Sequence, residues 1–262
     1  MILPQKPSYN EKIEIPNELG IEVFVKREDV LHAEISGNKF RKLTYNLEEA
    51  KQQGKTKLLT FGGAYSNHIA AVAAAGRDYG FETIGVIRGE ELEWKYQENP
   101  TLKKASQDGM QFYFATRTQY RNKTNADFLE NLHQQFGDFY IIPEGGTNEF
   151  AVKGCEEILT DEDAVFNFVC CAVGTGGTIS GIINSLKPHQ KALGFPALKG
   201  DFLFNDIQKY AKNTQWDLVT DYHFGGYAKI NTELKLFLNS FYQKYLISLD
   251  PVYTSKMVFG VI

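Results

Sequence analysis

Short apolar segments alternate with longer amphipathic segments along most of this 262-residue chain. Several apolar segments are nearly continuous in apolar residues, which is typical of strands covered on both faces in a parallel sheet. Repetition of strand, helix and strand predicts an α/β fold with right-handed crossovers. The expected strands span residues 21–29, 57–63, 83–89, 110–115, 138–146, 164–174, 191–198 and 216–226.

Two of the helices between these strands have recognisable boundaries. Leu43, Leu47 and Ala50 fall at i, i+4 and i+7, on one face of a helix that Gly54 would end. Ser66 stands where it could cap a second helix, which would end at Gly80. Both helices follow polar turns, so side chains at their first residues are candidates for a site.

Composition and charge exclude several classes of protein. The formal net charge of -4 argues against a general nucleic-acid binder, because phosphate affinity needs clustered, uncompensated Lys and Arg. Residues 1–20 carry prolines and charges where a secretory signal needs an apolar core, and no apolar run approaches membrane-spanning length. We therefore expect a cytoplasmic protein without a membrane partner. Cys155, Cys170 and Cys171 form no CxxC pair, so we expect no metal site.

The glycine-rich segment GTGGTISG, residues 174–181, follows the most apolar of the expected strands and opens a helix. Glycines allow close approach of the backbone, and amides at a helix start bind anions, so the segment predicts a cradle for phosphate. It is neither a Walker loop nor a GxGxxG motif. A tight turn without a ligand is the alternative.

A second turn between an expected strand and a helix, within residues 61–76, presents Ser66, Asn67 and His68. These side chains would lie at a helix N-terminus, where developing negative charge is stabilised. The alternative is that Ser66 only caps the helix and that His68 is a surface residue.

A third turn, EISGNKFRKL at residues 34–43, places Lys39, Arg41 and Lys42 at a helix start. The helix dipole and the two neighbouring cations disfavour a protonated amine at Lys39, and a lysine with a lowered pKa can capture a carbonyl group. An ordinary basic first turn remains the alternative. A phosphate cradle, a carbonyl-binding lysine and a polar Ser-Asn turn are together what pyridoxal phosphate needs.

Five segments carry a resemblance to a known family: VKREDVLHAEISGNKFRKL, FGGAYSNHIAAVAAAG, IPEGGTN, GTGGTISG and LDPVYTSKM. In order and spacing they resemble the D-cysteine desulfhydrase and 1-aminocyclopropane-1-carboxylate deaminase family. These are pyridoxal-phosphate enzymes of the tryptophan-synthase-β fold type, also called fold type II. The resemblance runs from about residue 20 to the last residue, and it implies two three-layer α/β/α domains with mostly parallel sheets.

The resemblance implies a role for each matching residue. Lys39 would form the covalent bond to pyridoxal 5'-phosphate and later move protons at the substrate Cα. Asn67 would hydrogen-bond the phenolic oxygen of the cofactor ring, and Ser66 would contact the substrate carboxylate or act as a nucleophile or base. The phosphate loop would consist of Gly174, Thr175, Gly176, Gly177 and Thr178.

The same resemblance assigns Tyr227 and Tyr253 as active-site tyrosines and places Thr254 opposite the pyridine nitrogen. The deaminase branch typically has glutamate at the latter position, and the desulfhydrase branch has threonine. A hydroxyl cannot stabilise a pyridinium as a carboxylate does, so Thr254 favours α,β-elimination from D-cysteine over cyclopropane ring opening. Tyr65, Ile69 and Ala70 depart from the residues usual in relatives, so the substrate pocket is not a standard one.

The resemblance also implies a division into domains. A large cofactor-binding domain would contain residues 1–44 and 154–262, and a small domain would be inserted at residues 45–153. The large domain is expected to be shortened, because relatives continue for some tens of residues beyond MVFGVI. A homodimer acting on a small amino acid is expected, and an inactive cofactor-binding homologue is an alternative. A nicotinamide-dependent dehydrogenase is disfavoured, because no GxGxxG with a following acidic residue occurs.

Overall fold

The computed structural model describes residues 2–200 and 202–262. By packing, the chain divides into two compact units. Unit 1 consists of the N-terminal residues up to Pro7 together with Glu28–Ala151, and unit 2 consists of Ser8–Arg27 together with Val152–Ile262. Each unit has its own sheet and its own buried apolar clusters.

Unit 1 is built on a parallel sheet with the strand order β5-β4-β3-β6. Because side chains alternate along a strand, Leu58 packs with the helices on one face, whereas Leu59 packs with those on the other. The strands are β3 (Lys57–Gly62), β4 (Glu82–Arg88), β5 (Gln111–Ala115) and β6 (Tyr140–Ile142). Helices α1 (Asn38–Gln52), α2 (Asn67–Tyr79) and α3 (Pro100–Gln107) cover the first face, and α4 (Arg117–Arg121) and α5 (Ala126–Phe136) cover the second.

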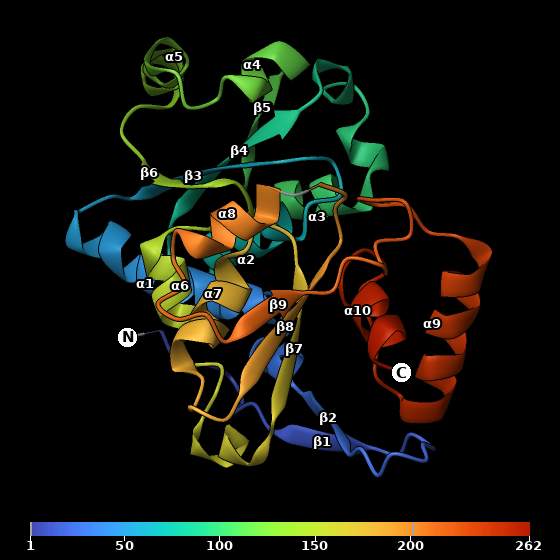
Figure 1. Cartoon of the computed structure of the whole chain (residues 1–262). Helices are drawn as coiled ribbons and strands as arrows, with labels where there is room; N and C mark the ends of the chain where they lie inside the picture. Colours follow the sequence, from blue (N-terminus) through green and yellow to red (C-terminus); the bar gives the residue numbers. More distant parts are fainter. Residues whose placement is uncertain (1, 201) are drawn as a thin grey trace. The chain divides into compact units, whose positions relative to one another are not determined.

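Unit 2 contains a second parallel sheet with the strand order β7-β8-β9 and an antiparallel pair, β1 with β2. A Cβ added at Gly194 would meet Ile179 of α7, whereas the next residue, Phe195, lies against Gly260 of α10. Helices α7 and α10 therefore cover opposite faces of this sheet, as Figure 1 shows. The elements are β1 (Asn10–Ile13), β2 (Val23–Lys26), β7 (Phe168–Val173), α7 (Gly177–Ser185), β8 (Lys191–Pro196), α8 (Phe202–Gln208), β9 (Trp216–Leu218), α9 (Thr232–Tyr245) and α10 (Thr254–Val261).

The expected fold class is confirmed. All eight expected strands form, although most are shorter than expected, and β1 is a strand that we did not expect. Ser66 caps α2 and Gly80 ends it in a left-handed conformation, both as expected. The domain boundaries stay a prediction, but α1 runs without a break through residue 44 and packs within unit 1. Helix α6 (Glu149–Cys155) contains the junction that follows Ala151.

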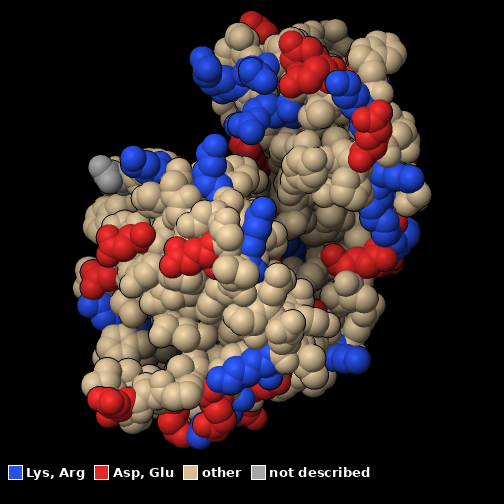
Figure 2. All heavy atoms as spheres, turned by 90° about the vertical axis from the view of Figure 1, so that its right-hand side faces the viewer, with Lys and Arg blue, Asp and Glu red and all other residues tan. Residues whose placement is uncertain are grey.

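Charges of both signs are mixed over the surface shown in Figure 2, where Lys and Arg side chains lie among Asp and Glu side chains. Within residues 2–200 and 202–262, no helix is both long enough and apolar enough to cross a membrane. The cysteines form no disulfide among these residues. Burial raises the pKa of the Cys170 thiol to about 11, so this group is uncharged near neutral pH.

Candidate active site

Lys39 lies at the second position of α1, in unit 1. Gly37 precedes the helix with a φ of 59°, a left-handed conformation that glycine adopts without strain. The Lys39 amide donates to the Ser36 carbonyl oxygen at 3.3 Å, which completes the turn, and the side chain is half-buried. Gly37, the residue before α1, has no side chain of its own to cap the helix.

Arg41 and Lys42, the other two cations of this turn, are held by partners elsewhere in unit 1. The Arg41 guanidinium donates to both carboxylate oxygens of Glu28, at 2.9 and 3.1 Å. The Lys42 side chain is 2% exposed, and its ammonium donates to the Gly145 carbonyl oxygen at 2.9 Å and to Thr147 Oγ1 at 3.0 Å. Lys42 is therefore a buried structural cation that fixes the turn after β6.

The start of α2 presents Ser66 and Asn67 directly after β3. Ser66 Oγ accepts a hydrogen bond from the Ile69 amide at 3.3 Å, so the hydroxyl does cap the helix. Asn67 is exposed at the first helical residue. A Cβ at Gly62 would lie 2.8 Å from Ser66 Oγ and 2.5 Å from Ile69 Cγ1, so only glycine fits beneath this turn.

His68 is 2% exposed, so the alternative that it is a surface residue is wrong. Thr60 Oγ1 donates its proton to the Ile142 carbonyl oxygen, so His68 Nε2 must donate to Thr60 Oγ1, at 2.9 Å. Burial holds the pKa of His68 well below its ordinary value, and the charges of Lys39 and Lys42 act in the same direction. His68 is therefore a neutral side chain close to Lys39. The burial of His68 could have been predicted from the sequence, because His68, Val72 and Ala75 fall at i, i+4 and i+7 on the apolar face of α2.

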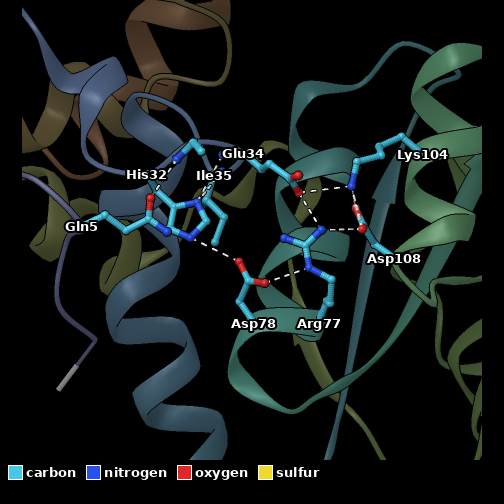
Figure 3. Close-up of polar contacts among 9 residues, drawn as sticks. Gln5, His32, Glu34, Ile35, Arg77, Asp78, Lys104 and Asp108 are labelled. Atoms are coloured by element: carbon cyan, nitrogen blue, oxygen red, sulfur yellow. Dashed lines mark hydrogen bonds and ion pairs between the residues drawn. The ribbon is translucent and has the colours of Figure 1, made fainter.

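A network of ion pairs connects the segment before Lys39 with α2 and α3 (Figure 3). Arg77, in the last turn of α2, donates to Glu34 at 2.7 Å, to Asp78 at 2.8 Å and to Asp108 at 2.6 Å. Lys104 of α3 donates to Glu34 at 3.1 Å and to Asp108 at 2.6 Å. The network joins Glu34, five residues before Lys39, to two helices of the same unit.

This network predicts a pH dependence of stability. Hydrogen bonds from Arg77 lower the pKa values of Glu34 and Asp78. The two carboxylates therefore stabilise the fold fully above their ordinary pKa values, and this stabilisation is lost as the pH falls through their lowered pKa values. We expect Arg77→Met to reduce the loss of unfolding free energy between neutral and acid pH by about 1 kcal/mol, because these side chains are partly exposed. Denaturant titrations at both pH values measure this difference. The exposed Arg88, changed to Met, is the control, and an equal pH dependence in Arg77→Met and wild type would contradict the prediction.

The glycine-rich turn of unit 2 lies between β7 and α7. Gly176 has a φ of 81° and, as the residue before a helix of nine residues, has no side chain of its own to cap that helix. A Cβ at Gly174 would lie 2.9 Å from the Tyr253 ring, and one at Gly176 would lie 3.0 Å from Ile207 Cγ1. Glycine at these two positions thus lets the backbone pack closely at a helix N-terminus, which is a geometry suited to a phosphate group.

Tyr253 and Thr254 lie at the start of α10, also in unit 2. Asp250 Oδ1 accepts from the amides of Val252 and Tyr253, both at 2.8 Å, and this fixes the chain where it enters the helix. The Thr254 hydroxyl accepts from the Asp250 amide at 2.7 Å. The Tyr227 and Tyr253 rings have centroids 6.2 Å apart and meet at 61°, in an edge-to-face arrangement.

The structure thus brings the expected site residues together in two sets. Lys39 lies near the start of α2 with Ser66 and Asn67 in unit 1, and the glycine-rich turn lies near Tyr253 and Tyr227 in unit 2. That both sets act on one ligand stays a prediction.

Known proteins resemble this chain in sequence and in fold. The family described as "Pyridoxal-phosphate dependent enzyme" matches residues 11–200. A Pyrococcus horikoshii protein, provisionally named 1-aminocyclopropane-1-carboxylate deaminase, is 31% identical over 95% of this chain and 81% of its own length. A D-cysteine desulfhydrase of Serratia proteamaculans is 27% identical over 93% of this chain and 81% of its own length. The crystal structure of an "ACC deaminase homologue" matches with a TM-score of 0.81 and 28% identity, over 99% of this chain and 85% of that one.

The chain belongs to the family of pyridoxal-phosphate-dependent enzymes, and its cofactor is pyridoxal phosphate. The glycine-lined start of α7 fits the phosphate group, and the half-buried Lys39 is an amine able to bond the aldehyde. When bound, this cofactor withdraws electrons from the substrate Cα.

Proposed function

We propose that this protein is a lyase that acts on a small amino acid, and that it catalyses α,β-elimination from D-cysteine. With water, the products are pyruvate, ammonia and hydrogen sulfide. The carrying observation is Thr254 beside Tyr253 at the start of α10, because the desulfhydrase branch has threonine there and the deaminase branch typically has glutamate. The D-cysteine desulfhydrase among the relatives supports this choice.

In the proposed reaction the chain's own residues bind the substrate and move its protons. The Lys39 amine takes the proton from the substrate Cα. The neighbouring His68 is neutral, so it adds no positive charge beside the Lys39 amine. Ser66 and Asn67, at the start of α2, contribute a hydroxyl and an amide for the substrate carboxylate and the cofactor ring.

The residues of unit 2 serve the leaving group and the cofactor. Tyr227 and Tyr253 offer two phenol groups for the departing thiol or the carboxylate. The amides of Gly176, Gly177 and Thr178 would hold the phosphate group of the cofactor.

The second candidate is opening of the cyclopropane ring of 1-aminocyclopropane-1-carboxylate, with α-ketobutyrate and ammonia as products. It is favoured by the name of the Pyrococcus horikoshii relative and by that of the solved structure. The two reactions share binding of the amino-acid carboxylate and differ in the bond that breaks.

The two candidates are separated by assaying the protein, loaded with pyridoxal phosphate, on D-cysteine, L-cysteine, D-serine and 1-aminocyclopropane-1-carboxylate. Pyruvate formed chiefly from D-cysteine is the expected result. α-Ketobutyrate from the cyclopropane as the chief product would replace the first candidate by the second.

Changing Thr254 to Glu tests the observation that carries the proposal. The carboxylate would replace a neutral hydroxyl that accepts from the Asp250 amide, and we expect kcat/KM for elimination to fall by about tenfold, the equivalent of about one hydrogen bond. Thr254→Ser keeps the hydroxyl and should retain activity. Elimination by Thr254→Glu at the wild-type rate would show that this residue does not set the chemistry.

We propose in addition that the protein is cytoplasmic, as expected from its composition, and that it is a homodimer, as the resemblance implies. Light scattering of the purified protein measures the mass in solution, for which two copies of the 29.7 kDa chain are expected. A mass equal to that of one chain would contradict the homodimer.

A further inference from the structure

The turn that carries Tyr227 has a strained backbone. Phe224 and Ala228 have φ values of 52° and 56°, in the left-handed region that residues other than glycine rarely adopt. Gly225 and Gly226 between them also have positive φ values, 88° and 114°. Such a turn persists only when its surroundings hold it in place.

The ammonium of Lys256 holds this turn. Lys256 lies on α10, is 1% exposed, and donates to the His223 carbonyl oxygen at 2.9 Å and to the Gly226 carbonyl oxygen at 2.8 Å. Hydrogen bonds from a charged donor are stronger than those between neutral groups. Burial lowers the pKa of Lys256, and the charge of Asp250 opposes this effect. The two carbonyl groups compensate part of the lost hydration.

Two further contacts place the same turn on α10. The Phe224 and Phe259 rings meet edge to face, with centroids 5.0 Å apart. The Tyr222 ring lies so close to Gly260 that a Cβ there would be 2.6 Å from Tyr222 Cδ2. Side chains before and within the turn therefore rest on the helix that Lys256 belongs to.

Tyr227 follows Gly226 directly, and Tyr253 lies three residues before Lys256. The Tyr227 side chain is 45% exposed, so burial alone does not hold it beside Tyr253, where the ring centroids are 6.2 Å apart. We propose that Lys256 is a positioning residue, whose ammonium fixes the strained turn at residues 222–228 on α10 and so holds Tyr227 beside Tyr253 for the substrate. The proposal rests on the proposed function in one respect, that the two tyrosines serve the reaction.

The first test needs neither cofactor nor substrate. The amides of Gly225, Gly226 and Lys229 are hydrogen-bonded within the turn, so hydrogen exchange over residues 222–229 should be slowed in the wild-type protein. Lys256→Met should speed this exchange by about tenfold or more and leave β7 and β8 unchanged. Lys229→Met, which removes an exposed charge directly after the turn, is the matched control. Unprotected amides in the wild type would overturn the proposal even if the Lys256 variant did not fold.

The second test is a double-mutant cycle on kcat/KM with the amount of bound cofactor measured in each variant. Lys256→Met should lower kcat/KM by roughly ten- to a hundredfold, because a misplaced side chain loses most of its effect. In a Tyr227→Phe background the same change should cost less than about threefold, since Lys256 acts through Tyr227. Equal losses in both backgrounds would overturn the proposal. If the protein eliminates none of the tested amino acids, the proposed function fails, and the exchange test still decides whether Lys256 holds the turn.

Discussion

Lys39→Ala should abolish covalent binding of pyridoxal phosphate and nearly all elimination activity. Loss of proton transfer alone should lower kcat on the order of 10²- to 10⁴-fold, and loss of the covalent bond should lower it further. The change removes a half-buried side chain at the start of α1 and leaves the Glu28 and Gly145 contacts of Arg41 and Lys42 in place. Stability should therefore change little.

The measurement combines the visible absorbance of the bound cofactor with pyruvate formation from D-cysteine. Lys51→Ala, an exposed change near the other end of α1, is the matched control and should behave like the wild type. A Lys39→Ala protein that kept both the absorbance and the activity would show that another lysine binds the cofactor.

Lys42→Met, unlike Lys39→Ala, should cause a large loss of stability. The ammonium donates to the Gly145 carbonyl oxygen and to Thr147 Oγ1 in an environment where the side chain is 2% exposed. Methionine fills a similar volume but leaves these acceptors without their donor, so we expect a loss of about 3 kcal/mol in the free energy of unfolding. Denaturant unfolding measures the loss, and Lys103→Met, on the exposed face of α3, is the control. A loss equal to that of the control would contradict a structural role for Lys42.

The turn at residues 34–43 carries three neighbouring cations, and local rules alone could only favour Lys39 as the lysine that binds the cofactor. The partners of the other two are remote in sequence, Glu28 for Arg41 and the turn at Gly145 for Lys42. Such pairings depend on the tertiary fold, which periodicity does not encode. The fold class was predictable, because strand and helix periods and helix caps are local signals.

Other features were missed for related reasons. The short polar strand β1, NEKI, has no apolar run, and it forms because β2 pairs with it. The burial of Lys256 was not predicted, although this residue is a single charge in the otherwise uncharged sequence of α10. That contrast was a usable signal for a buried, partnered cation, but its acceptors at His223 and Gly226 could be found only in the folded chain.

The most direct test of the central claim is to identify the lysine that binds the cofactor. The protein is loaded with pyridoxal phosphate, reduced with borohydride and digested, and the modified peptide is sequenced by mass spectrometry. The account predicts a single modified peptide containing Lys39. Modification at Lys42 or Lys256 instead, or no covalent modification at all, would contradict it.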